Sequence, residues 1–182
     1  MSRLAIVDPN TATGKAKDLL DAVKAKLGIV PNMTRVMADS PAVLEGYLQF
    51  SGALSGGSLE PRLWEQIALL SAQENQCNYC LSAHTAIGKM VGLKQEEIVA
   101  SREGKGGNDQ RTAALTFAKA VLERKGQVSE SEIAAVRAAG YSDGEIAEII
   151  AHVALNVFTN YFNVATGVEV DFPKVSYTEL GA

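Results

Sequence analysis

The chain contains few cysteines and no excess of basic residues. Cys77 and Cys80 are the only cysteines among 182 residues, too few for the disulfide framework of a small secreted protein. The 17 Lys and Arg residues are outnumbered by 21 Asp and Glu residues, which gives a formal charge of −4. Because the basic residues are also scattered, we expect neither nucleic acid nor a membrane surface as a partner.

Long apolar runs and nucleotide-binding motifs are missing as well. No apolar span reaches the roughly 18 residues of a membrane helix, and Asp8 and Pro9 interrupt the first apolar run too early for a signal peptide. We therefore expect a soluble, cytoplasmic protein. The sequence has no Gly-rich phosphate loop, P-loop or dinucleotide fingerprint, so no bound organic cofactor is expected.

The apolar residues that are present recur at intervals of three and four, which is the period of an α-helix. Alternating β-branched runs, which would indicate strands, are scarce. The composition does not shift along the chain, and its 47% hydrophobic residues suffice for one core. The sequence therefore predicts an all-α fold in a single domain spanning residues 1–182.

Helix breakers and capping patterns divide this domain into helices. Gly28, Gly92 and Gly167 each follow an apolar periodic segment, as helix-ending glycines do. Ser129 and Ser142 each precede a glutamate by three residues, which is the capping-box pattern of a helix start. We expect helices over residues 13–26, 33–38, 41–55, 61–73, from the cysteine motif to 91, 109–125, from 129 onward, and 143–165.

Residues 77–84 are the most informative stretch, because they contain both cysteines and one of the two histidines. If this segment is helical, steps of about 100° per residue place Cys77, Cys80 and His84 within roughly 60° of one another. His84, one turn from Cys80, can take the proton of that thiol, and the second thiol can trap an oxidised sulfur as a disulfide. The spacing therefore predicts dithiol redox chemistry.

Two other interpretations of the cysteines remain. They can be small buried apolar residues, as free cysteines often are. They can also bind zinc together with His84 and Glu65, although structural zinc sites commonly use a second Cys or His pair that this chain lacks. We expect no metal.

Several other polar and aromatic residues could belong either to the site or to the packing. His152 is expected to be a packing residue, with the alternative that it reaches the site from another helix. Asn156, Asn160 and Asn163 need hydrogen-bond partners on their apolar helix and are interpreted as lining a subunit contact. Tyr79 is interpreted as a packing or interface residue, and Glu74 as a solvated helix-end charge, with the alternative that it replaces Glu65 in the site. The residues expected in the core are Phe50, Trp64, Phe117, Phe158 and Phe162.

The pattern of Glu65, then Cys77 and Cys80, then His84 resembles the AhpD-like alkylhydroperoxidases of the carboxymuconolactone decarboxylase superfamily. Its single-domain peroxidase-related branch is also similar at residues 27–32, 156–160 and 171–173. The founding peroxidase carries a histidine between its cysteines, where this chain has Tyr79.

This resemblance implies an AhpD-like fold built from helix pairs, assembled as a homotrimer or a trimer-based hexamer. It also implies reduction of organic hydroperoxides, with Cys80 as the attacking sulfur, Cys77 as the resolving sulfur, and Glu65 and His84 as a proton relay. An external dithiol of the lipoyl type, or a protein reductant, would restore the thiols. Because Glu65 lies about 120° from Cys77 on a continuous helix, the relay requires a break between them.

Two other functions remain possible at this stage. One is a non-redox enzyme of the carboxymuconolactone decarboxylase type, whose members generally lack the Cys pair. The other is an interaction module in which the dithiol senses oxidants without turnover.

Overall fold

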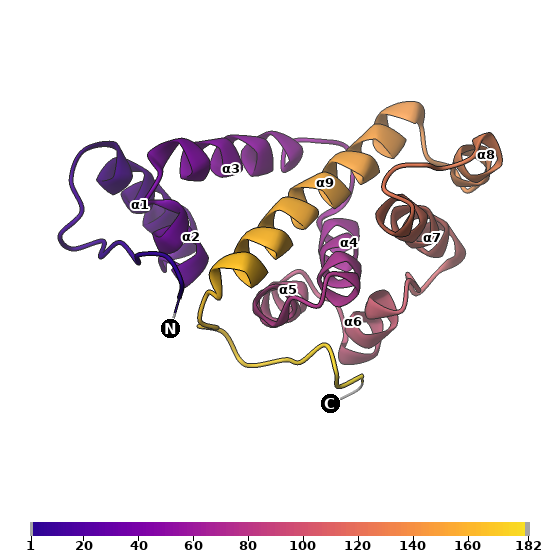
Figure 1. Cartoon of the computed structure of the whole chain (residues 1–182). Helices are drawn as coiled ribbons and strands as arrows, with labels where there is room; N and C mark the ends of the chain where they lie inside the picture. Colours follow the sequence, from indigo (N-terminus) through magenta and orange to yellow (C-terminus); the bar gives the residue numbers. More distant parts are fainter. Residues whose placement is uncertain (1, 181–182) are drawn as a thin grey trace.

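The computed structural model describes residues 2–180, which form nine α-helices and no β-strand (Figure 1). The predicted all-α class is therefore confirmed. The helices are α1 (Gly14–Leu27), α2 (Asn32–Met37), α3 (Pro41–Leu54), α4 (Pro61–Glu74), α5 (Asn78–Met90), α6 (Gln95–Arg102), α7 (Asp109–Glu123), α8 (Glu130–Ala138) and α9 (Asp143–Thr166).

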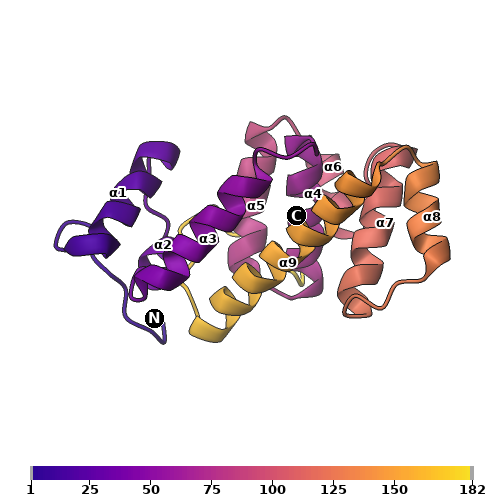
Figure 2. The same ribbon diagram turned by 90° about the horizontal axis from the view of Figure 1, so that it is seen from above.

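Helix α4 lies at the centre of the molecule and packs against α5, α6, α7 and α9. Its Ile67, Leu69 and Leu70 are completely buried, because apolar residues cover most of its circumference. The long helix α9 runs beside it, from α7 and α8 at one end to α2 at the other (Figures 1 and 2). A helix buried between so many neighbours is a rigid support for a site.

The helix ends follow the predicted signals. Gly28 and Gly167 adopt left-handed backbone angles, with φ of 75° and 63°, directly after α1 and α9. Ser129 and Ser142 form the expected capping boxes with Glu132 and Glu145. The predicted helices therefore begin and end within two residues of the observed ones wherever such a signal is present.

Three expectations were wrong. Helix α6 was not predicted, because its eight residues contain too few apolar positions to show a helical period. Phe50 and Phe158 were expected in the core, yet each is 40% exposed. They lie on α3 and α9 and line one groove, so helical spacing alone does not ensure burial.

The chain breaks between α4 and α5, as the predicted relay requires. Helix α4 ends at Glu74, and Gln76 adopts a left-handed conformation with φ of 54°. This turn redirects the chain before Cys77, so that α5 folds back along α4. In the described residues, 2–180, no helix is long and apolar enough to cross a membrane.

Candidate active site

The two cysteines lie at the start of α5, in the interior of the molecule. Cys77 is the N-cap of this helix, and its Sγ accepts a hydrogen bond from the Cys80 amide at 3.2 Å. Cys80 lies in the first turn. Both thiols are free, and only 1% of Cys77 and 2% of Cys80 is exposed. Capping by a sulfur holds the two side chains at the same helix end.

Glu65 and His84 meet across the gap between α4 and α5. The carboxylate Oε2 of Glu65 lies 2.8 Å from Nδ1 of His84, with both side chains largely buried. A carboxylate on Nδ1 leaves the other ring nitrogen of His84 for the proton of a reacting group. Burial alone would lower the pKa of His84, but the Glu65 carboxylate outweighs it, so this pKa is raised.

The surroundings of Cys80 favour its thiolate. Burial opposes ionisation, but hydrogen bonding from Cys77 and Asn163, the positive charge of His84 and the amide of Asn160 lower the pKa of Cys80 to about 7. Half of a thiol with this pKa is ionised at neutral pH, which makes it a competent nucleophile.

Cys77 has the opposite character. Its hydrogen bond with Cys80, together with burial, raises its pKa far above the ordinary thiol value. The pair therefore consists of one thiolate and one thiol, the combination that attack by one sulfur and resolution by the other needs.

Helix α9 supplies polar groups that the sequence analysis assigned wrongly. Asn160 and Asn163 were interpreted as lining a subunit contact, but both are buried and face the start of α5 and the turn that precedes it. Asn163 Nδ2 lies 3.3 Å from Cys80 Sγ. The signal was present in the sequence as amides on an apolar helix, but nothing in the sequence indicates which partner they meet.

Asn156, the third asparagine of the row, is part of the helix packing. Its Nδ2 donates to the carbonyl of His152 on the preceding turn at 2.8 Å. Its hydrogen bond therefore goes to its own helix and not to either sulfur, although it is buried like Asn160 and Asn163.

His152, Tyr79 and Glu74 lie outside the hydrogen bonds of the two sulfurs. The His152 ring stacks on Trp64 with centroids 5.6 Å apart, and burial lowers its pKa, so it packs as a neutral ring. The Tyr79 hydroxyl accepts from the Met33 amide at 3.2 Å, consistent with its predicted packing role. Glu74 pairs with Lys119 rather than with a histidine.

Tyr47 on α3 is a neighbour of the site that sequence reasoning did not identify. Burial raises the pKa of Tyr47 to about 12, and the charges of Cys80 and Glu65 add to this effect. The tyrosine also lines a groove of about 300 Å³ with Phe50 and Phe158. Through Tyr47 this apolar groove adjoins the site.

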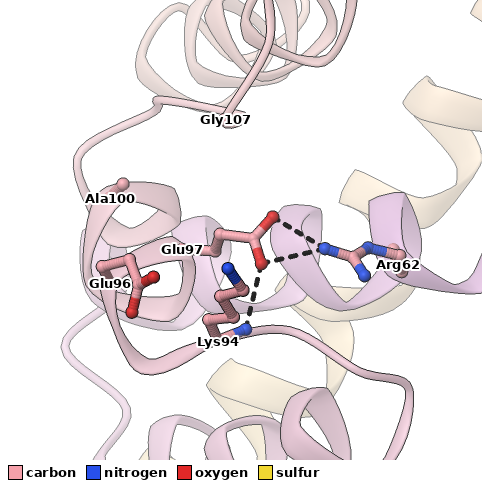
Figure 3. Close-up of a pocket in the computed structure, with 6 residues that line it drawn as sticks. All are labelled: Arg62, Lys94, Glu96, Glu97, Ala100 and Gly107. Carbon is pink, nitrogen blue, oxygen red and sulfur yellow. Dashed lines mark hydrogen bonds and ion pairs between the residues drawn. The ribbon is translucent and has the colours of Figure 1, made fainter.

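A larger cavity of about 600 Å³ lies elsewhere, between α4, α6 and the loop at Gly107 (Figure 3). In it the Glu97 carboxylate accepts two hydrogen bonds from Arg62, at 2.7 and 2.9 Å, and one from the Lys94 amide. The charges of Arg62 and Glu97 are thus neutralised within the wall, and neither cysteine nor histidine lines the cavity. Within residues 2–180, no three His, Cys, Asp or Glu side chains are grouped as metal ligands.

Known proteins resemble the chain in both sequence and structure. Residues 41–120, which include Glu65, both cysteines and His84, match the model of the carboxymuconolactone decarboxylase family. No curated protein sequence matches the chain.

Three solved structures have the same fold. The alkylhydroperoxidase AhpD core of an uncharacterized peroxidase-related protein from Ralstonia eutropha JMP134 aligns with a TM-score of 0.84 and 24% identity, over 93% of this chain and 92% of that chain. An uncharacterized peroxidase-related protein from Silicibacter sp. TM1040 aligns with a TM-score of 0.81 and 21% identity, over 91% of this chain and 88% of that chain. The debrominase Bmp8, in complex with 2,3,4-tribromopyrrole, aligns with a TM-score of 0.77 and 20% identity, over 92% of this chain and 91% of that chain.

The helical architecture, the match of residues 41–120 and the conjunction of two cysteines with a Glu–His pair agree with one another. Residues 41–120 therefore match the carboxymuconolactone decarboxylase family, and the chain as a whole has the fold of the AhpD-like, peroxidase-related structures.

Proposed function

We propose that this protein is a thiol-dependent peroxidase that reduces organic hydroperoxides. The observation that carries the proposal is the asymmetry of the cysteine pair: Cys80 has a lowered pKa beside His84 and Asn163, whereas Cys77 is held as a thiol. A single reactive thiolate next to a protonated resolving thiol is the arrangement of a two-cysteine peroxidase.

The reaction begins when His84, held by Glu65, takes the proton of Cys80. The Cys80 thiolate attacks the terminal oxygen of the hydroperoxide, so that a sulfur–oxygen bond forms and the oxygen–oxygen bond breaks. The alkoxide leaves with the proton from His84 as an alcohol. Cys80 is then a sulfenic acid, which condenses with the Cys77 thiol to a disulfide and releases water.

An external dithiol completes the cycle by thiol–disulfide exchange, in which its own sulfurs become a disulfide and the two cysteines are reduced. No bound organic cofactor or metal takes part in this scheme. A cytoplasmic location suits the chemistry, because thiol reductants keep that compartment reducing.

We further propose that the protein works as a cyclic oligomer, a homotrimer or a trimer-based hexamer. The outer faces of α3 and α9 support this assembly. They carry Phe50, Phe158, Tyr161 and Val164, all exposed, and α9 has no Lys, Arg, Asp or Glu after Glu148. Uncharged apolar faces of this kind are covered in most soluble proteins.

The test is hydroperoxide consumption with a panel of dithiols, using the wild type, Cys77→Ser and Cys80→Ser. We expect turnover only in the wild type. Cys77→Ser should still form one sulfenic acid at Cys80, which dimedone traps, whereas Cys80→Ser should form none. A sulfenic acid at Cys77 in the Cys80→Ser variant, at the wild-type rate, would reverse the two roles.

The same experiment separates the alternatives. Bromide release from 2,3,4-tribromopyrrole without hydroperoxide turnover would indicate debromination, as named for the similar debrominase. Activity that survives thiol alkylation would indicate a non-redox, decarboxylase-like enzyme. Oxidation that stops after one equivalent with every dithiol would indicate a redox sensor.

A further inference from the structure

Helix α9 brings two buried amides to the sulfur that reacts. Asn160 and Asn163 are three residues apart, so their side chains lie on neighbouring parts of one helix face. Asn160 is completely buried and Asn163 nearly so. A buried amide costs stability unless its polar atoms are paired, so the partners of these two define what they do.

Asn163 contacts the nucleophile directly. Its Nδ2 lies 3.3 Å from Cys80 Sγ and 3.2 Å from Met33 Sδ. The Met33 thioether has no hydrogen to donate, so the amide nitrogen, and not its oxygen, must face the two sulfurs. The Asn163 carbonyl oxygen is buried and has no hydrogen-bond partner among residues 2–180.

Asn160 is oriented by a different contact. Its carbonyl oxygen accepts a hydrogen bond from Asn75 Nδ2 at 2.9 Å, in the turn that precedes Cys77. The amide nitrogen of Asn160 therefore points elsewhere, and it is buried without a hydrogen-bond partner among the described residues. Asn160 lies one turn before Asn163 on the same face of α9, and it helps to lower the pKa of Cys80, so this amide lies beside the sulfur.

Three amide groups thus face the reacting sulfur or lie beside it. Asn163 Nδ2 donates to the sulfur, Asn160 Nδ2 is a donor without a partner among the described residues, and Asn163 Oδ1 is an acceptor without one. A hydroperoxide in line with Cys80 offers the complementary groups: an O–H donor on the oxygen under attack, and a second oxygen on which negative charge develops as the bond breaks.

We propose that Asn160 and Asn163 are catalytic residues that bind the hydroperoxide group: Asn163 holds the Cys80 sulfur and accepts the O–H of the substrate, and Asn160 donates to the leaving oxygen. This inference rests on the proposed peroxidase function and assigns its substrate-binding groups. When the oxygen–oxygen bond breaks, the electron pair passes to the leaving oxygen, and the Asn160 amide stabilises that charge until the proton from His84 arrives.

The test measures two reactions of Cys80 in the full chain carrying Cys77→Ser. Iodoacetamide reports the thiolate alone, because its iodide leaving group needs no oxyanion donor. Oxidation by tert-butyl hydroperoxide, followed by trapping of the sulfenic acid, reports thiolate and oxygen site together. Both rates are measured over a range of pH, so that the pKa of Cys80 is obtained for each variant.

We expect Asn160→Leu to lower the oxidation rate constant about 100-fold and to change alkylation little, because it removes the oxygen donor. Asn160→Asp keeps the acceptor for Asn75 and loses the donor, so its oxidation should remain slow even above the pKa of Cys80. Asn163→Leu should slow both reactions at neutral pH and raise the pKa of Cys80, because it removes a hydrogen bond that stabilises the thiolate.

Asn156→Leu is the matched control, a buried amide of the same helix that should leave the ratio of oxidation to alkylation unchanged. Oxidation of both Asn160 variants at the wild-type rate would overturn the inference, as would an equal loss in Asn156→Leu. If no hydroperoxide oxidises the wild type while Asn163→Leu still shifts the pKa, the peroxidase function is wrong and only the sulfur-holding role of Asn163 stands.

Discussion

At the scale of single residues, Glu65 contributes to the charge state of the reactive thiol through His84. It supports the positive charge of His84, and that charge helps to stabilise the Cys80 thiolate. The folded-state pKa of Cys80, about 7, lies below the thiol value of about 8.5 in an unfolded chain. Ionisation of Cys80 therefore adds stability above pH 8.5, and this contribution is lost as the pH falls through 7.

Replacement of Glu65 should consequently change reactivity in one pH range only. In Cys77→Ser protein, Glu65→Gln removes the carboxylate that raises the pKa of His84, so the pKa of Cys80 should rise toward about 8.5. Compared with Cys77→Ser protein that keeps Glu65, alkylation by iodoacetamide should be roughly tenfold slower at pH 7 and equally fast above about pH 9. A pH profile of the rate measures this.

Glu74→Gln is the control, because Glu74 lies on the same helix and pairs with Lys119. It should leave the profile unchanged. A Glu65→Gln profile that coincides with that of Glu74→Gln would exclude Glu65 from the relay.

At the scale of elements, the segment after α9 covers the start of α5. Its Tyr177 amide donates to Asn78 Oδ1 and its Val175 amide to Ser82 Oγ, both at 2.9 Å. Phe172 meets the Tyr79 ring edge to face, with centroids 5.8 Å apart. Figure 1 shows this segment passing along α5 toward α6. The C-terminal segment is therefore one wall of the dithiol site.

Weakening that wall should expose Cys77. We expect Phe172→Ala to destabilise the protein by about 2 kcal/mol, since the ring is partly buried, and to raise the rate at which a bulky disulfide reagent modifies Cys77. Urea unfolding and thiol counting measure the two effects. Phe158→Ala, on the outer face of α9, should leave thiol modification unchanged; equal exposure of Cys77 in both variants would contradict the assignment of the wall.

The sequence predicted those parts of the fold and site that depend on local chemistry. Helix ends can be predicted at Gly28, Ser129 and Ser142, because these residues provide hydrogen-bond partners for backbone groups that the helix itself leaves unpaired. The contact between Glu65 and His84 needed the family resemblance and a break in the chain, since helical spacing alone keeps them apart. The contact of Asn163 with Cys80 spans 83 positions, and no local rule predicts it.

At the scale of the whole molecule, the outer faces of α3 and α9 lie side by side and are uncharged over most of their length (Figure 2). We expect sedimentation of the full chain to give a trimer or hexamer at micromolar concentration, because exposed apolar faces of this extent are usually covered.

A charge placed on this face should dissociate the oligomer. Phe158→Glu is expected to give smaller species in sedimentation, since a carboxylate cannot be buried there without a partner. Met90→Glu, an equally drastic change at an exposed residue of α5, is the control and should leave the mass unchanged. Wild-type protein that sediments as a monomer would refute the proposed assembly.

The burial of both sulfurs has a consequence for the timing of a catalytic cycle. In each cycle two substrates, a hydroperoxide and a dithiol, must reach the sulfurs, and both cysteines are almost completely buried. A small hydroperoxide needs only a brief gap between side chains, whereas exchange with a dithiol needs a path wide enough for a second sulfur in line with the bond. Oxidation and reset thus require different degrees of opening. A slender dithiol carried on a flexible arm needs a smaller opening of the protein than a bulky reductant does. The shape of the reductant, as much as its redox potential, therefore decides how quickly the disulfide is reduced.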